Sequence, residues 1–139
     1  MKTKVKLSNE KVIKLDSGNV MHAMKSSSNF YDGFGEAYFS FIKFGCIKGW
    51  KLHKKMTLNL LVPLGKVKFV TYENESFQEY IISDTNYSRL TIPPKILFGF
   101  QGLSENESLI LNIANIEHNP DEVIRKDLNE INYNWSVNK

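Results

Sequence analysis

The chain has 139 residues, 42% of them apolar and 12% aromatic, and its formal net charge is +3. These values are typical of a folded domain with a sizeable core, and they exclude a disordered chain. The lysines are spread along the sequence, so nucleic-acid binding is not expected, although a small positive excess favours an anionic small molecule.

The single cysteine, Cys46, excludes a disulfide framework within the chain and is expected to be a buried apolar residue. Residues 1–10 are polar and rich in lysine, without the apolar core of a signal peptide. No run approaches the roughly 18 apolar residues that a membrane span needs. We therefore expect a cytoplasmic protein with no membrane association.

Short β-rich runs separated by turn signals dominate the chain, and they predict strands. In chain order these cover residues 4–7, 11–15, 36–44, 46–53, 57–62, 66–72, 77–82, 89–92, 97–100 and 108–113. The turn at residues 63–65 predicts a hairpin between the strands on either side of it. Pro120 and the acids that follow it predict a short helix over residues 121–128.

So many short strands at regular spacing favour one all-β barrel or double-sheet jelly roll, which can hold a small ligand in its mouth. We expect a single domain over residues 1–139, with the barrel core at about 36–116. Lys51 and His53 stand two residues apart on a predicted strand and so share one face. If that face is the barrel interior, both side chains meet a ligand; if it is the exterior, neither does, and His53 could also be a hydrogen-bonded core residue.

Two blocks of sequence resemble one family. Residues 45–53 (GCIKGWKLH) carry a glycine, a basic residue, a second glycine and a histidine-bearing strand. Residues 87–94 (YSRLTIPP) are followed by Gly-Phe at 99–100 and Leu-Ser at 103–104. A weaker third block covers 115–120, 127–128 and 131–135. This pattern is similar to the dTDP-4-dehydrorhamnose 3,5-epimerases and to the related sugar-nucleotide 3,4-ketoisomerases.

The resemblance implies a cupin, a double-stranded β-helix jelly roll with a short C-terminal helix. It implies a cofactor-free epimerase or ketoisomerase that moves protons on a 4-keto-6-deoxy sugar nucleotide, in bacterial polysaccharide or lipopolysaccharide biosynthesis. It also implies a homodimer with an exchanged N-terminal strand, whose interface the aromatic run at 36–44 could supply. The expected partner is a nucleotide-diphosphate sugar.

Residue types then assign the expected roles. A proton-transfer reaction beside a ketone needs a base, an acid and a group that stabilises the enolate. A diphosphate needs cations, and a base or sugar ring can stack on an aromatic side chain. The expected catalytic residues are His53, Lys51 and Tyr38, with Tyr133 as a second acid by type, and the expected substrate-binding residues are Lys48, Arg89, Glu36 and Trp50.

The chain departs from the family pattern at several positions. Lys51 stands where the epimerases have their histidine, and His53 matches the second histidine of the ketoisomerases. Leu111 and Glu117 lie where catalytic tyrosines are expected, and Phe98 replaces a later histidine. No counterpart is expected for the acid that orients the histidine in longer members.

With one histidine on the predicted strand, a metal site of three or four ligands is not expected. Two alternatives to an enzyme stay open. One is a non-catalytic cupin that binds a sugar nucleotide, and the other is a structural interaction module without a cavity.

Overall fold

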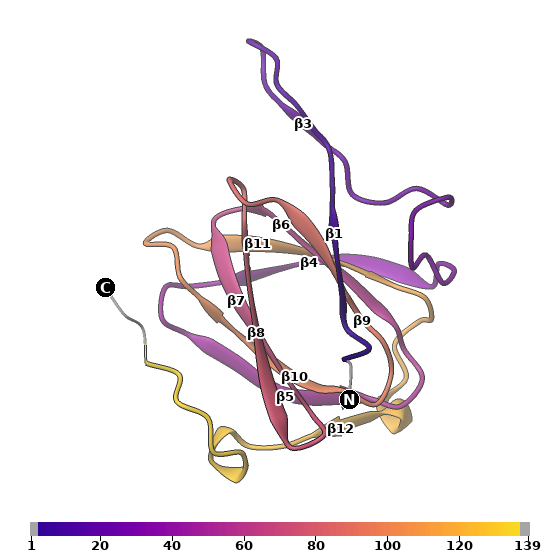
Figure 1. Cartoon of the computed structure of the whole chain (residues 1–139), viewed down its shortest axis with the longest axis vertical. Helices are drawn as coiled ribbons and strands as arrows, with labels where there is room; N and C mark the ends of the chain where they lie inside the picture. The colour runs from indigo at the N-terminus through magenta and orange to yellow at the C-terminus, as the bar shows by residue number, and fades with distance from the viewer. Residues whose placement is uncertain (1–2, 137–139) are drawn as a thin grey trace.

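Two five-stranded antiparallel sheets form the body of the protein in a computed structural model, which describes residues 3–136 (Figure 1). The first sheet has the strand order β1-β9-β6-β11-β4 and the second β12-β5-β10-β7-β8, while β2 and β3 pair in a small hairpin outside the barrel. The strands are β1 (Lys6–Asn9), β2 (Val12–Ile13), β3 (Val20–Met21), β4 (Glu36–Ile42), β5 (Ile47–His53), β6 (Leu58–Leu64), β7 (Lys66–Glu73), β8 (Ser76–Ser83), β9 (Ser88–Ile92), β10 (Leu97–Gly102), β11 (Ser108–Ala114) and β12 (Val123–Arg125).

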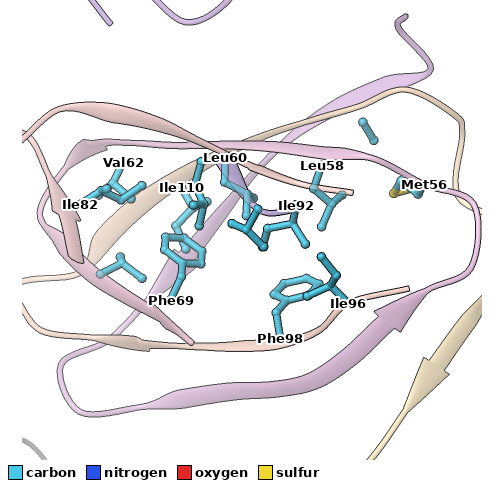
Figure 2. Close-up of a cluster of buried hydrophobic side chains, with 14 of the residues drawn as sticks. Met56, Leu58, Leu60, Val62, Phe69, Ile82, Ile92, Ile96, Phe98 and Ile110 are labelled. Atoms are coloured by element: carbon cyan, nitrogen blue, oxygen red, sulfur yellow. The ribbon is translucent and has the colours of Figure 1, made fainter. Parts of the chain in front are cut away.

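Alternation along the strands builds the core between the sheets. On β11, every second residue from Ser108 to Ala114 is buried and the residues between them are half-buried. Figure 2 shows the apolar side chains of both sheets meeting in the interior, among them Leu60 and Ile110 from the first sheet and Phe69 and Phe98 from the second. The all-β jelly-roll barrel expected from the sequence is confirmed.

The predicted hairpin at residues 63–65 is wrong. β6 belongs to the first sheet and β7 to the second, so the chain crosses between the layers at Gly65. Gly65 has φ 93°, a conformation that a side chain disfavours, and a Cβ there would lie 2.3 Å from the Ser108 hydroxyl. A turn signal marks a change of direction, but it does not say whether the second strand pairs with the first.

The predicted helix at 121–128 is also wrong. Residues Pro120–Glu122 form one 3₁₀ turn (η1), β12 follows at once, and Leu128–Glu130 form a second 3₁₀ turn (η2). Asn119 caps the first turn and Pro120 begins it, so the helix-start signal was real but was not followed by a helical run. Within residues 3–136, no helix is long and apolar enough to cross a membrane.

Cys46 is exposed, not buried as expected. It follows Gly45 in the turn between β4 and β5, where its amide donates to the Lys43 carbonyl at 3.1 Å. Turn residues project from the ends of the barrel, so the usual burial of free cysteine does not apply here.

Arg89 holds the N-terminal segment against the outer face of the first sheet. Its neighbour on β9, Leu90, is part of the core, so the guanidinium points the other way. It is 1% exposed and pairs with Glu10 at 2.9 Å. It also donates to the Asn59 side chain and to the Asn29 carbonyl. The contacts join three segments that are far apart in the sequence.

Replacing Arg89 with Met should lower the free energy of unfolding by about 3–5 kcal/mol, because the half-buried Glu10 carboxylate and the buried Asn59 side chain would lose their cationic partner. Urea unfolding followed by circular dichroism measures this. The matched control is Arg125→Met, at an exposed position on β12, which should change stability by no more than about 0.5 kcal/mol. Equal stability of the two variants would contradict this role for Arg89.

Candidate active site

The two sheets enclose a cavity of about 560 Å³, a size typical of ligand pockets. Five apolar side chains from both sheets line part of it: Leu58, Leu60, Phe98, Phe100 and Ile110. The remaining lining is polar and comes mainly from β4, β5 and the segment that follows η1. The cavity therefore has an apolar wall beside a group of polar and charged side chains, as a pocket for an amphipathic ligand needs.

His53 lines this cavity and forms a buried pair with Glu122, which is not itself among the lining residues. The Nδ1 atom of His53 lies 2.8 Å from Oε2 of Glu122, and the two side chains are 7% and 3% exposed. The other carboxylate oxygen of Glu122 accepts a hydrogen bond of 3.0 Å from the Met56 amide. Because both carboxylate oxygens are engaged, the carboxylate is fixed and fixes the imidazole in turn.

The pair sets the protonation of the imidazole. With Glu122 accepting from Nδ1–H, the lone pair of His53 is on Nε2, where it can take a proton. Burial lowers the pKa of His53 below 6.5, and the hydrogen bond and charge of Glu122 partly oppose this shift. Phe98 stacks beside the ring with a centroid distance of 6.2 Å. At neutral pH the imidazole is therefore neutral and ready to act as a base.

The register of β12 brings Glu122 to His53. β12 pairs with β5 so that Val123 lies opposite His53 and Arg125 opposite Lys51. The Lys54 amide donates to the Glu122 carbonyl at 2.7 Å and anchors the start of the strand. The expectation that no acid orients the histidine is thus wrong. Sequence reasoning missed Glu122 because it assigned this segment to a helix, although the run Val123-Ile124 carries a short β signal.

Cations gather around the same cavity. Lys48 and Lys51 reach it from β5, and Arg125 and Lys126 reach it from the β12 segment. Burial lowers the pKa of Lys51, and the charges of Arg125 and Lys48 lower it further. Lys48 donates to the Phe41 carbonyl at 2.8 Å and so links β5 to β4. Mutual repulsion among these cations is relieved when an anion lies between them.

Tyr38 and Asn112 lie together on the first sheet and line the cavity. They face each other across β4 and β11, and the Asn112 amide donates to the Tyr38 hydroxyl at 2.6 Å. Since the phenol oxygen accepts this bond, its own proton is free for another partner. Asn112, like Arg125 and Lys126, was not among the residues singled out in the sequence.

Two of the expected binding residues lie elsewhere. Arg89 is on the outer face of the first sheet, where its partners are protein groups, and it does not line this cavity. Glu36 uses its carboxylate to accept from the His118 amide at 2.9 Å and does not line the cavity either. Neither residue belongs to the site in this cavity.

Trp50 touches the cavity rim but packs its ring on the opposite face of the second sheet. The indole is 1% exposed and lies among Phe77, Tyr133 and Trp135, with centroid distances of 5.2–6.3 Å. Tyr133 belongs to this outer cluster and donates to Glu79, and burial raises its pKa. Neither ring is placed to stack on a ligand or to move a proton in the cavity.

Within the described range of the chain, no three His, Cys, Asp or Glu side chains converge in a way that could hold a metal ion. Glu130, which lines the cavity, uses its carboxylate to accept from the Asp127 amide. The groups that the site offers for proton transfer and charge stabilisation are His53, Glu122, Tyr38 and the cations.

The chain is similar in sequence and in fold to several known proteins. No family model matches the chain. The "dTDP sugar isomerase" of Desulfovibrio desulfuricans G20 is 30% identical, with a TM-score of 0.88 over 95% of this chain and 90% of that one. The "spore coat polysaccharide biosynthesis protein SpsL" of Bacillus subtilis strain 168 is 25% identical over 133 residues, 88% of each chain.

Two more distant solved structures share the fold. The 3,4-ketoisomerase QdtA of Thermoanaerobacterium thermosaccharolyticum, in complex with TDP, is 20% identical with a TM-score of 0.79 over 91% of this chain and 90% of that one. A dTDP-4-dehydrorhamnose 3,5-epimerase of Bacillus anthracis, with TDP and pyrophosphate bound, is 19% identical with a TM-score of 0.81, covering 98% and 87%. With its jelly roll, its buried histidine and a 30% identical relative along almost its whole length, the chain belongs to the dTDP-4-dehydrorhamnose 3,5-epimerase-like cupins, the branch of sugar-nucleotide epimerases and 3,4-ketoisomerases.

Proposed function

We propose that the protein is a cofactor-free epimerase or ketoisomerase that acts on a 4-keto-6-deoxy sugar nucleotide in bacterial polysaccharide biosynthesis. The observation that carries this proposal is the buried His53–Glu122 pair, which faces a cavity surrounded by cations. The relatives support the choice of substrate, since they include a dTDP-sugar isomerase and a protein of spore coat polysaccharide biosynthesis.

In the proposed reaction, Nε2 of His53 takes the proton from the carbon beside the ketone, and the C–H electron pair becomes the enolate π bond. Glu122 stabilises the imidazolium that forms, because its carboxylate accepts from Nδ1–H. Lys51, a half-buried cation beside His53 on the strand, stabilises the enolate oxygen. The products then depend on where the proton returns.

Return of a proton to the opposite face of the same carbon gives the epimer. Tyr38 can supply it, because its hydroxyl lines the cavity from the other sheet with its proton uncommitted. Return of the proton to the former carbonyl carbon, with transfer of the neighbouring hydroxyl's proton to the former keto oxygen, moves the ketone instead. His53 can serve this ketoisomerase route alone, by carrying the proton from one carbon to the next.

The cations Lys48, Arg125 and Lys126 bind the diphosphate in this proposal. Arginine offers a fork of donors that matches two phosphate oxygens, and lysine offers a point charge. The apolar wall, which includes Leu60 and Phe98, is suited to the methyl group of a 6-deoxy sugar. The alternative is a cupin that binds a sugar nucleotide without turning it over, and the same cavity and cations would support it.

We also propose that the protein is a cytoplasmic homodimer. The outer face of β4 carries Phe39 and Phe41, which are 64% and 55% exposed, and β4 lies at the edge of its sheet. Aromatic side chains are enriched in interfaces between subunits. Cys46 is a free thiol at the surface, as reducing compartments allow.

Replacing His53 with Asn should slow proton transfer strongly. In D₂O, the wild-type protein should place deuterium on the carbon beside the ketone of a dTDP-4-keto-6-deoxy sugar. The variant should do so about a thousandfold more slowly, because it has no base. NMR or mass spectrometry measures the exchange, and the identity of the product distinguishes an epimerase from a ketoisomerase.

The control is His118→Asn, at an exposed position outside the cavity. Binding of the sugar nucleotide by wild type without any exchange would favour the non-catalytic alternative.

Replacing Glu122 with Gln should move the acid limb of the kcat/KM profile to lower pH. In the wild-type protein the limb should lie below pH 6.5, because burial lowers the His53 pKa. Glu122 raises that pKa against burial, so the loss of its charge lowers the pKa further. The maximal rate should also fall, by about a hundredfold, because the imidazolium loses its partner.

The control for this profile is Glu117→Gln, which removes an exposed carboxylate and should leave the limb in place. An acid limb that stays unchanged in Glu122→Gln, or moves to higher pH, would contradict the proposed pair.

Replacing Phe39 and Phe41 together with Lys should convert a dimer into a monomer, because charges would stand in an apolar interface. Size-exclusion chromatography with light scattering measures the mass. Ile81→Lys, at a 43% exposed position on the other sheet, is the control that should stay dimeric. A monomeric wild-type protein would overturn the proposed assembly.

A further inference from the structure

Asn112 lines the cavity and carries a buried polar side-chain atom without a partner. Asn112 is 4% exposed, and its Oδ1 has no hydrogen-bond donor within the part of the chain that the structure describes. Trp50 also touches the cavity and its indole Nε1 is also without a partner among the described residues, but its ring packs on the opposite face of the second sheet. The amide nitrogen of Asn112 is committed to the Tyr38 hydroxyl at 2.6 Å. A buried carbonyl oxygen that has lost its water and found no donor costs free energy, so a ligand that supplies a donor at this point gains affinity.

The surroundings of Asn112 favour a ligand contact over a structural one. On β11 it lies between Tyr38 of β4 and Leu60 of β6, and both neighbours also line the cavity. The hydroxyl of Thr71, another buried atom without a partner, belongs to a residue outside this lining. The unpartnered oxygen of Asn112 is therefore in the ligand space, whereas that of Thr71 is in the packed wall.

We propose that Asn112 recognises the sugar of the substrate, with Oδ1 accepting a hydrogen bond from a hydroxyl of the hexose. A carbonyl oxygen can only accept, which excludes the diphosphate and the keto oxygen as its partners, since both are acceptors. The sugar hydroxyls are donors, and the cavity that holds Asn112 also holds His53. This inference rests on the proposed function, because it requires a sugar nucleotide in the cavity.

This contact would link sugar binding to proton transfer by Tyr38. The Asn112 side-chain amide accepts from the sugar with Oδ1 and donates to the Tyr38 hydroxyl with Nδ2, so the tyrosine proton stays free to reach the substrate. Asn112 is then a substrate-binding residue and also a positioning residue for Tyr38. An apolar replacement of the same size removes both effects.

Isothermal titration calorimetry with two probes tests the proposal without any need for turnover. Thymidine diphosphate carries the nucleoside and the phosphates, and TDP-glucose adds a hexose with its hydroxyls. Asn112→Leu should weaken TDP-glucose by about tenfold while leaving thymidine diphosphate within about twofold of wild type. Thr71→Val is the matched control and should change neither affinity. An equal loss for both probes, or no loss for either, would overturn the assignment.

A second measurement uses the unmodified protein, in case Asn112→Leu does not fold. The side-chain amide resonances of Asn112, assigned by their absence in an Asn112→Asp spectrum, should move when TDP-glucose is added and stay in place with thymidine diphosphate. Resonances that move equally with both probes would refute the sugar contact. A wild-type protein that binds neither probe would instead refute the proposed function, on which the inference depends.

Discussion

The hydrogen bond between His53 and Glu122 is the constraint from which the rest of the site follows. It joins the end of β5 to a carboxylate that comes 69 residues later, and it is 2.8 Å long and almost wholly buried. The chain places the two side chains together by pairing β12 with β5, so that the edge of one sheet supplies the acid for the base at the strand's end. One imidazole nitrogen is occupied by this contact and the other is left for chemistry.

The cavity separates charge from apolar surface in a way that matches an amphipathic ligand. Lys48, Lys51 and Arg125 supply positive charge, while Leu58, Phe98 and Ile110 supply the apolar lining. Lys48 and Arg125 are exposed and Lys51 is half-buried, so solvent screens the charge of Lys51 less than the charges of the other two. Lys51 lies two residues before the base on the same strand and is itself titratable, with a pKa that burial lowers. His53 is the single histidine among the described residues that line the cavity.

The sequence predicted the strands well because alternation and turn residues are local signals. It predicted Lys51 and His53 as a pair for the same reason, since residues two apart on a strand share a face. The predictions from sequence were wrong where the local structure depends on contacts between distant segments. Gly65 marks a turn in either case, and only packing decides that the chain crosses to the other sheet. Pro120 and its acids begin a 3₁₀ turn as readily as a helix, and pairing with β5 makes the next three residues a strand.

The dependence on contacts between distant segments also explains why several expected binding residues lie outside the cavity. Arg89 was expected at a diphosphate by its residue type, yet a one-residue step along β9 puts it on the opposite face from Leu90. Trp50 faces outward beside Lys51 by the same alternation. Arg125 and Asn112 could not be placed, because each reaches the cavity from a strand whose register the sequence does not encode locally. Glu122 could not be placed either, because the pairing of β12 with β5 brings the 3₁₀ turn before β12 to His53.

A crystal structure of the protein with a bound TDP-linked hexose would test the account most directly. The diphosphate should lie between Lys48, Arg125 and Lys126, and a ring carbon of the hexose should lie within about 3.5 Å of Nε2 of His53. A diphosphate held elsewhere on the protein, or a hexose that lies away from the imidazole, would contradict it.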